Sequence, residues 1–388
     1  GGMRKLRYCV PHTLTRRYTS FRYRGIMEYG AITVDTSIFD QKGLLLESGL
    51  LNALVQFNNK PAKLVLSEIV IREVNAHLIK KVNDSYAQLD KSLNNAKKHI
   101  FGNVQDISID RIDGEVVAKE RLESYVNNTG AVLISASNGV DLNHLIKLYF
   151  NNEPPFAEAG KKKSEFPDAI ALLSLEAWAI ENKTRILAVT TDKDWANFAE
   201  NSDYIDVLED LAQAISKFEP NEKTFDFTKR LSLAMSSGEA QDIVELITDR
   251  VADAVSEQYL YVEAESPFYW DSHDFQAEFS DIEFITDDEG AILLNPIQSQ
   301  DNHVVFEVKA NIAATAMSSF TLSVHDSIDG DSVKLGEVFS ESDLNFETGI
   351  LFTINGSWDG ELSALDVDDV EVLSFPKSVD FGYLEPDV

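Results

Sequence analysis

The sequence predicts an α/β domain, a parallel sheet with flanking helices, followed by a smaller α+β domain dominated by antiparallel β-strands. In the first part of the 388-residue chain, short apolar runs rich in β-branched residues alternate with stretches of helical periodicity. This alternation is typical of a parallel sheet covered on both faces. In the last third of the chain, the pattern changes to the two-residue alternation of half-buried strands. A length about twice that of a usual domain also favours two domains.

Four apolar segments are the strand candidates of the first domain, and helical periodicity follows each of them. The strand candidates are 31–38 (AITVDTSI), 63–70 (KLVLSEIV), 185–191 (RILAVTT) and 204–208. The helix candidates are 39–57, a stretch from residue 71, 169–180, 194–200 and the stretch that ends at 218. Residues 83–150 are polar and Asn-rich without a strong strand pattern, so we expect a helical insertion there.

A polar linker at 219–228 is expected to separate the two domains, so that the first spans 27–220 and the second 221–388. The second domain is expected to begin with one amphipathic helix at about 238–258. Five later segments alternate apolar and polar residues between Gly, Asn and Asp turns: HVVFEVKANI, SSFTLSVHD, VKLGEVF, GILFTING and DVEVLSF. This alternation predicts an antiparallel sheet.

Composition narrows the class of protein. With 44% hydrophobic and 26% charged residues, the chain has enough apolar material for a packed core. Cys9 is the single cysteine and cannot form an internal disulfide. No apolar run reaches the ~18 residues of a membrane span, and no secretory signal is evident. Gly1 and Gly2 resemble a tag remnant, and we expect a cytoplasmic protein without a membrane partner.

Charge is distributed unevenly between the two domains. The whole chain has a net charge of −31. Residues 221–388 hold 7 Lys or Arg and 36 Asp or Glu, a net charge of −29, whereas residues 1–220 have a net charge of −2. A surface as acidic as that of the second domain repels nucleic acid. We therefore expect this domain to provide solubility, or to regulate the first domain by covering a basic rim or binding a basic partner.

The first 26 residues form a basic extension. They contain seven Lys or Arg, no acidic residue, and the interleaved aromatics Tyr8, Tyr18, Phe21 and Tyr23. This composition is typical of RNA-binding segments. A flexible extension that orders only by packing is the favoured interpretation, and Met27 directly precedes the first strand candidate.

Four carboxylates stand at the ends of elements that meet at one edge of the predicted sheet. They are Asp35, Glu73, Asp168 and Asp192. The carboxyl ends of parallel strands are where ligands bind in such folds. Each residue alone has an ordinary explanation as a helix cap, a complement to a helix dipole or a solvated side chain. Their combination is different, because several carboxylates are costly to bury together unless cations neutralise them.

The sequence lacks the parts of several other kinds of active site. The seven histidines form no close pair, and one cysteine cannot build a zinc site. Neither a P-loop nor a Gly-x-Ser-x-Gly elbow is present. Converging carboxylate oxygens are the ligands that Mg²⁺ or Mn²⁺ prefers, and such sites serve phosphoryl transfer by metal-activated water. The residues therefore predict a carboxylate-held divalent cation.

Four motifs in this order resemble the acidic motifs of PIN-domain ribonucleases: VDTSIFD, SEIVIREV, KKKSEFPDAIAL and AVTTDKDW. The Lys-rich approach to the third motif is most similar to the larger PIN-like branch with a helical insertion. The resemblance covers about 27–218 and implies a Mg²⁺- or Mn²⁺-dependent endonuclease, usually acting on RNA. Asp35, Glu73, Asp168 and Asp192 match the family's acidic positions, and Asp194 is a weaker match for a metal ligand.

The resemblance also implies residues that contact substrate. Thr36 and Ser37 match hydroxyl positions after the first acid, and Thr191 precedes Asp192 similarly, although helix capping explains them equally well. Lys161, Lys162, Lys163 and Lys193 would hold phosphates; a mobile solvated loop is the alternative for the first three. Glu68 is an alternative to Glu73, but it is expected to lie in a strand and to point elsewhere.

Several functional alternatives remain open from the sequence. The PIN-like part could be an inactive binding or sensing module, or a nuclease acting on DNA. The family's frequent roles suggest a toxin, a toxin–antitoxin component or a phage-defence effector. A regulatory protein could bind the acidic domain, and a homo-oligomer is left open. No family is recognised for 221–388.

Overall fold

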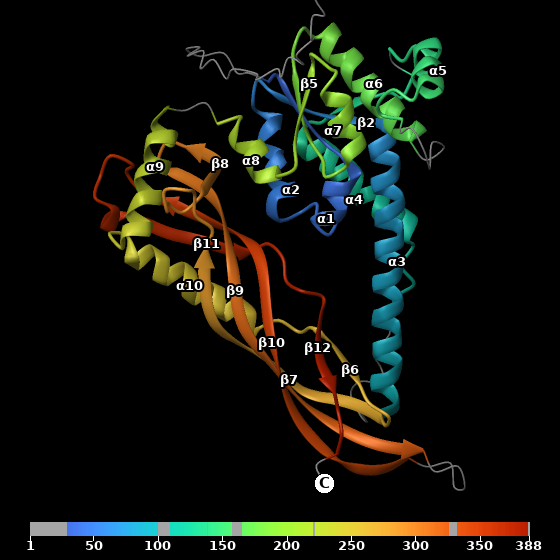
Figure 1. Cartoon of the computed structure of the whole chain (residues 1–388), viewed down its shortest axis with the longest axis vertical. Helices are drawn as coiled ribbons and strands as arrows, with labels where there is room; N and C mark the ends of the chain where they lie inside the picture. The colour runs from blue at the N-terminus through green and yellow to red at the C-terminus, as the bar shows by residue number, and fades with distance from the viewer. Residues whose placement is uncertain are drawn as a thin grey trace, which may run out of the picture.

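The computed structural model of the protein describes residues 29–99, 109–137, 139–156, 165–219, 222–325 and 332–386. The basic extension at 1–26 and the lysines 161–163 lie outside the described residues. The chain folds into a parallel α/β unit and an antiparallel β unit that lie side by side (Figure 1). The predicted fold class is confirmed in both parts. Within the described residues, no helix is long and apolar enough to cross a membrane.

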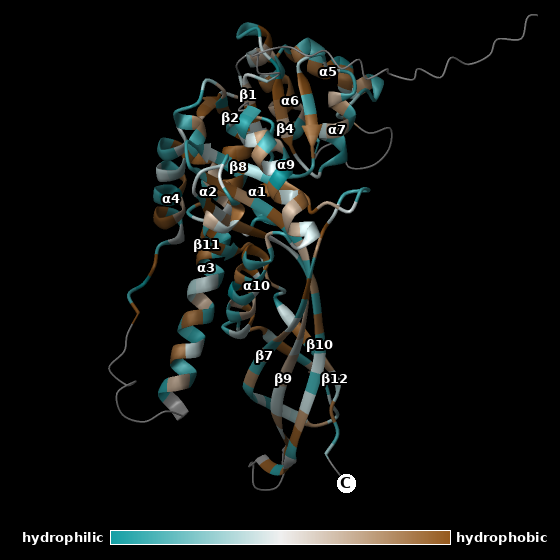
Figure 2. Cartoon of the chain, turned by 90° about the vertical axis from the view of Figure 1, so that its left-hand side faces the viewer, coloured by the Kyte–Doolittle hydropathy of each residue, from teal (hydrophilic) through white to brown (hydrophobic). Residues whose placement is uncertain are grey.

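A five-stranded parallel sheet forms the centre of the first unit, with the order β3-β2-β1-β4-β5. Its strands are β1 (Ala31–Val34), β2 (Lys63–Ser67), β3 (Val132–Ile134), β4 (Ile186–Val189) and β5 (Ile205–Leu208). All four residues of β1 and of β4 are buried, because helices cover both faces of the sheet. Hydrophobic residues colour these central strands brown in Figure 2.

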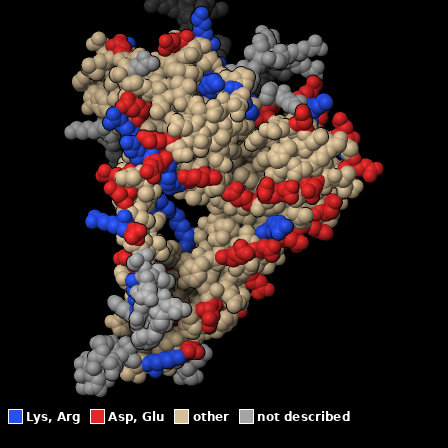
Figure 3. Space-filling model, turned by 180° about the vertical axis from the view of Figure 1, so that it is seen from behind, with Lys and Arg blue, Asp and Glu red and all other residues tan. Residues whose placement is uncertain are grey.

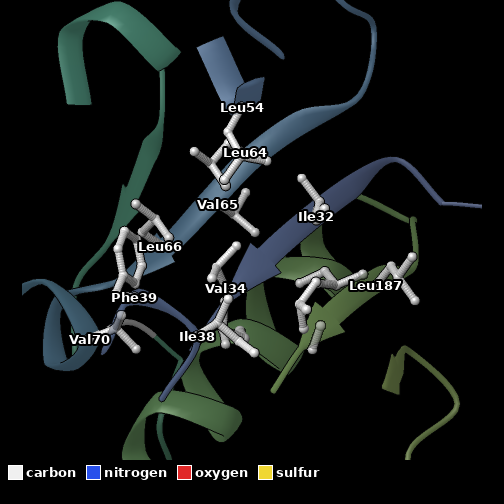
Figure 4. Packing of buried hydrophobic residues seen from close by; sticks show 14 of the residues in the cluster. Ile32, Val34, Ile38, Phe39, Leu54, Leu64, Val65, Leu66, Val70 and Leu187 are labelled. Carbon is white, nitrogen blue, oxygen red and sulfur yellow. The ribbon is translucent and has the colours of Figure 1, made fainter. Parts of the chain in front are cut away.

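Helices flank this sheet and contribute the rest of its core. They are α1 (Thr36–Gln41), α2 (Gly49–Ala53), the 3₁₀ helix η1 (Leu54–Asn58), α3 (Glu68–His99), α4 (Gly114–Thr129), α5 (Leu142–Asn151), α6 (Phe166–Glu181), α7 (Lys193–Ala199) and α8 (Leu211–Ser216). Figure 4 shows Ile38 and Phe39 of α1 and Val70 of α3 packed against Val34 and Leu66 of the sheet. The short helix that follows β1 is thereby held at the carboxyl edge of the sheet.

Two expectations for the first unit were wrong. Strand β2 ends at Ser67 and α3 begins at Glu68, three residues before the predicted start, so Glu68 is helical rather than part of a strand. The region 83–150 is not purely helical, because β3 pairs in parallel with β2 at the edge of the sheet. β3 has only three residues, of which Val132 and Leu133 are exposed, so it leaves almost no periodic signal.

The second unit consists of two helices packed on a long antiparallel sheet. Its elements are α9 (Glu222–Ser237), α10 (Gln241–Ser256), β6 (Tyr261–Glu265), β7 (Tyr269–Phe284), β8 (Leu294–Gln300), β9 (His303–His325), β10 (Ser332–Asn355), the 3₁₀ helix η2 (Leu362–Ala364), β11 (Asp366–Val372) and β12 (Ser378–Tyr383). The main sheet has the order β11-β10-β9-β7, and β8 also pairs with β9. β12 and β6 form a separate parallel pair.

The start of the second unit differs from the expectation of a linker and one helix. Helix α9 already begins at Glu222, inside the segment expected to be a linker. Phe227, Leu231 and Met235 of this helix are buried, spaced by four residues. Residues 219–228 contain Pro220 and few apolar residues, so this segment has the composition of a linker and the start of the helix is not evident in the sequence.

The two units share a packed junction. Ile297 of β8 and Leu351 of β10 belong to the hydrophobic core of the first unit. Gln56 Nε2 of η1 donates a hydrogen bond to the Ile297 carbonyl oxygen at 2.8 Å. Lys309 of β9 forms an ion pair with Asp210, which caps α8. The antiparallel unit is thus fixed against the parallel unit, and the Lys309–Asp210 pair places β9 beside the carboxyl end of β5.

Candidate active site

Asp35 is held rigidly between β1 and α1. It is the N-cap of α1, and its Oδ1 accepts a hydrogen bond from the Thr36 backbone N–H at 2.6 Å. Its Oδ2 accepts from Ser37 Oγ at 2.6 Å and from Thr190 Oγ1 at 2.9 Å. Only 5% of Asp35 is exposed. These donors stabilise a carboxylate in one orientation at the carboxyl edge of the sheet.

Glu73 is joined to this cluster through Thr36. Thr36 Oγ1 donates a hydrogen bond to Glu73 Oε2 at 2.7 Å. Because α3 begins at Glu68, Glu73 lies in the second turn of the helix rather than in the first turn as expected. Glu68 is turned away, since its Oε2 accepts from the Ala136 backbone N–H at 3.0 Å. The structure therefore places Glu73 beside Asp35, and Glu68 outside the cluster.

Thr190 connects Asp35 to Asp192. While its hydroxyl donates to Asp35, it also accepts from the Asp192 backbone N–H at 2.9 Å. Asp192 is the N-cap of α7 and accepts from the Asp194 backbone N–H at 2.7 Å. Thr190 is 1% exposed and was missed in the sequence, although it is the first of the two threonines in AVTTD. Thr191 is exposed, and its backbone N–H donates to Ser37 Oγ at 3.4 Å.

Asp168 is the carboxylate with the most perturbed acidity in the cluster. It lies in the first turn of α6 and accepts a hydrogen bond from Trp195 Nε1 at 3.1 Å. Burial raises the pKa of Asp168 to about 7, and the charges of Asp35, Asp192 and Glu73 add to the rise, while the Trp195 hydrogen bond opposes it. The four carboxylates therefore act on one another electrostatically. Trp195 is fully buried and was not predicted as a site residue.

The outer parts of the site are less enclosed. Burial raises the pKa of Asp194, and the charges of Asp192 and Glu165 add to the effect. Lys193 is the first residue of α7 and is exposed. The lysines 161–163, also expected beside the site, lie outside the described residues.

The donor set fits a hard divalent cation in its chemistry. In the described part of the chain, no Lys or Arg forms an ion pair with Asp35, Glu73, Asp168 or Asp192. Among these same described residues, no three His, Cys, Asp or Glu side chains are placed to hold one metal ion directly. Mg²⁺ usually binds through one or two carboxylates and keeps several of its waters. A cluster of uncompensated carboxylates suits that mode of binding.

The twofold role of Thr190 gives a direct prediction. Thr190→Val should lower the free energy of unfolding by about 1–3 kcal/mol, because it removes one of the two hydroxyl donors to the buried Asp35 Oδ2 and leaves the Asp192 N–H without its partner. It should also lower the rate of any reaction at Asp35 by about 10–100-fold, the usual cost of losing a group that orients a ligand. Urea unfolding and initial rates measure the two effects.

Thr33→Val is the matched control for this substitution. Thr33 lies on the same sheet, is fully buried, and its Oγ1 has no hydrogen-bond partner in the structure. Valine at this position should be neutral or stabilising, because it removes an unsatisfied hydroxyl. Equal losses of stability in the two variants would show that the Thr190 hydroxyl does not hold Asp35.

The fold and the site together define a nuclease-type fold: a parallel α/β sheet with carboxylates clustered at its carboxyl edge. Comparison with protein families agrees, since the family model of the PIN domain matches residues 32–195. The first unit of this chain is a PIN domain, as the four motifs implied. PIN domains are generally nucleases and typically use divalent metals. Comparisons with curated proteins and with solved structures gave no match.

Proposed function

We propose that the protein is a Mg²⁺- or Mn²⁺-dependent endoribonuclease. The observation that carries this proposal is the clustering of Asp35, Glu73, Asp168 and Asp192, where burial raises the pKa of Asp168 to about 7 and the charges of the other three carboxylates add to the rise. A like-charge cluster of this kind destabilises a protein unless a bound cation neutralises it, and such clusters are frequent at functional sites. The PIN domain supports the class of reaction, cleavage of phosphodiester bonds.

Each residue of the cluster has a proposed role. Asp35, Asp168 and Asp192 would hold the cation, in part through its bound waters, with Asp194 at the margin. When bound, the cation would neutralise the substrate phosphate and lower the pKa of the attacking water. Glu73 is oriented by the Thr36 hydroxyl, and its second oxygen can accept a hydrogen bond from that water. Thr190 holds the side chain of Asp35 in place.

The substrate contacts are divided between fixed and exposed groups. The hydroxyls of Thr36 and Ser37 already donate to Glu73 and Asp35, so their proposed role is to orient those carboxylates. Thr191 and Lys193 are exposed beside Asp192 and are the proposed phosphate contacts, together with lysines 161–163.

A cleavage assay tests the proposal. Labelled single-stranded RNA, tRNA and single-stranded DNA are incubated with the full chain in Mg²⁺, Mn²⁺ or EDTA, beside Asp168→Asn. We expect internal cuts in RNA that require metal and are lost in the variant. Cutting in EDTA, or equal cutting by Asp168→Asn, would contradict the metal-dependent assignment. Cutting of DNA alone would show that the substrate is DNA rather than RNA.

The wider proposal is a cytoplasmic toxin or defence effector whose PIN domain is controlled by the acidic unit. The contact between Lys309 and Asp210 supports control by this unit, because it lies beside the catalytic edge. Expression of the wild-type chain should arrest growth, and expression of Asp168→Asn should not. Normal growth at matched expression levels would argue against a toxin role.

A further inference from the structure

Helix α1, at the catalytic edge of the PIN domain, lies beside both α3 and the antiparallel unit. On one side, Asp40 of α1 lies 2.9 Å from Nδ1 of His77 on α3. At the other end, Lys42 and the β9 residue Lys309 line one cavity of about 380 Å³, together with Thr191. The N-cap of this same helix is Asp35. The catalytic edge therefore lies between α3 and the antiparallel unit.

Below α1, α3 and the antiparallel unit separate and then meet again. The space-filling view shows an opening between them, under the PIN domain (Figure 3). The opening ends where Tyr261 Oη of β6 donates a hydrogen bond to Gln88 Oε1 of α3 at 3.0 Å. These two residues also line a cavity of about 680 Å³ at this point. Protein therefore surrounds the opening: α1 above, α3 on one side, and the antiparallel unit on the other side and below.

The number of α3 residues between its two contacts gives the height of the opening. His77 contacts α1 and Gln88 contacts β6, and the two residues are 11 positions apart. At about 1.5 Å per residue, they are about 16 Å apart along the helix axis. Side chains narrow this span further. A single nucleic-acid strand fits such a space, and a double helix with its two backbones does not.

The two parts of the molecule that border the opening differ in charge. At 3.6 residues per turn, Lys80 and Lys81 lie on or beside the face of α3 that carries His77 and Gln88, and both lie between these two residues. Both lysines are exposed, and neither forms an ion pair with a described residue. Asp84 is the one acidic residue among them on this face. The opposite wall belongs to the unit with a net charge of −29.

We propose that this opening is the path by which a single nucleic-acid strand reaches the carboxylates, with its phosphates along the lysine face of α3. The acidic wall repels the strand and keeps it on the α3 side. This inference rests on the proposed function and adds a substrate geometry to it. A strand that passes through a closed opening needs a free end, so linear and circular strands must behave differently.

The test closes the opening covalently and measures binding rather than cleavage. Gln88→Cys and Tyr261→Cys are introduced together with Cys9→Ser and Asp168→Asn, so that only the two new thiols react and the strand is not cut. A bis-methanethiosulfonate reagent links the thiols, and a reductant releases them. Fluorescence anisotropy in Mg²⁺ then compares a linear strand with a circular strand of the same sequence.

We expect the cross-linked protein to bind the linear strand and to bind the circular strand at least about 10-fold more weakly, with the difference removed by reduction. Glutamate at Lys80 and Lys81 should weaken binding of the linear strand by about 10-fold or more, whereas Lys147→Glu on α5 should not. Equal affinity for the two strands in the cross-linked protein, or no binding of either, would overturn the path. Loss of cleavage by the unlinked wild type, with this binding pattern intact, would instead overturn the proposed nuclease.

Discussion

Asp35→Asn should abolish metal-dependent cleavage while the PIN domain stays folded. Asparagine is as good an N-cap as aspartate, so α1 keeps its first hydrogen bonds, and Thr190 keeps an oxygen to which it can donate. What the substitution removes is the buried negative charge. Loss of a group that only orients a metal ligand lowers metal affinity or activity by about 10–100-fold, so loss of the ligand itself should lower activity further. Initial cleavage rates, circular dichroism and thermal melting measure activity and folding.

Asp113→Asn is a control matched in chemistry and local structure. Asp113 is the N-cap of α4 and accepts hydrogen bonds from Glu115 N–H and Val116 N–H, but it is exposed and outside the carboxylate cluster. This variant should cut at the wild-type rate and melt within a few degrees of wild type. Full activity in Asp35→Asn would remove Asp35 from the site. Unfolding of Asp35→Asn would leave Asp168→Asn to test the same cluster.

The central strands of the PIN domain could be predicted because their signal is local. β1 and β4 are short runs of apolar residues, each followed by an aspartate that caps a helix. Elements at the margins leave weaker signals. β3 has only three residues, and α9 begins within a segment that contains Pro220 and few apolar residues. The start of α3 was misplaced because SEIV reads as the continuation of a strand, while in the structure Glu68 is held by Arg72 and by the backbone of Ala136.

The acidic residues of the candidate site could be predicted from the sequence, but the residues that orient them could not. Acidic residues at element ends are visible in the sequence, but the sequence does not show which hydroxyl turns toward which carboxylate. Thr190 and Thr191 are adjacent and alike, and only the fold buries the first against Asp35 and exposes the second. Trp195 faces Asp168 because α7 packs against α6, a contact between segments 27 residues apart. The pKa of Asp168 depends on these same long-range contacts.

In the absence of metal, the stability of the protein should fall as the pH rises from about 4 to about 7, and Asp168 should cause part of that fall. An unfolded Asp titrates near pH 4, whereas burial and the neighbouring carboxylates raise the pKa of folded Asp168 to about 7. Between these values the folded state binds the proton more tightly, so unfolding becomes easier as the proton leaves. Asp168 is partly exposed, so solvent screening reduces the effect to about 1–3 kcal/mol.

Urea unfolding of wild type and Asp168→Asn in EDTA, at several pH values across this window, isolates the contribution of Asp168, because the other titrating groups are common to both proteins. The asparagine variant should be the more stable protein at pH 7, and the difference should shrink toward pH 4. Saturating Mg²⁺ should reverse the order at pH 7, since a cation that binds only the folded wild type stabilises it and favours the ionised carboxylate. Trp195→Phe should shift the fall to higher pH, because the indole hydrogen bond favours the charged form of Asp168. Parallel stability curves for wild type and Asp168→Asn, unchanged by Mg²⁺, would show that the four carboxylates neither repel one another appreciably nor bind a cation.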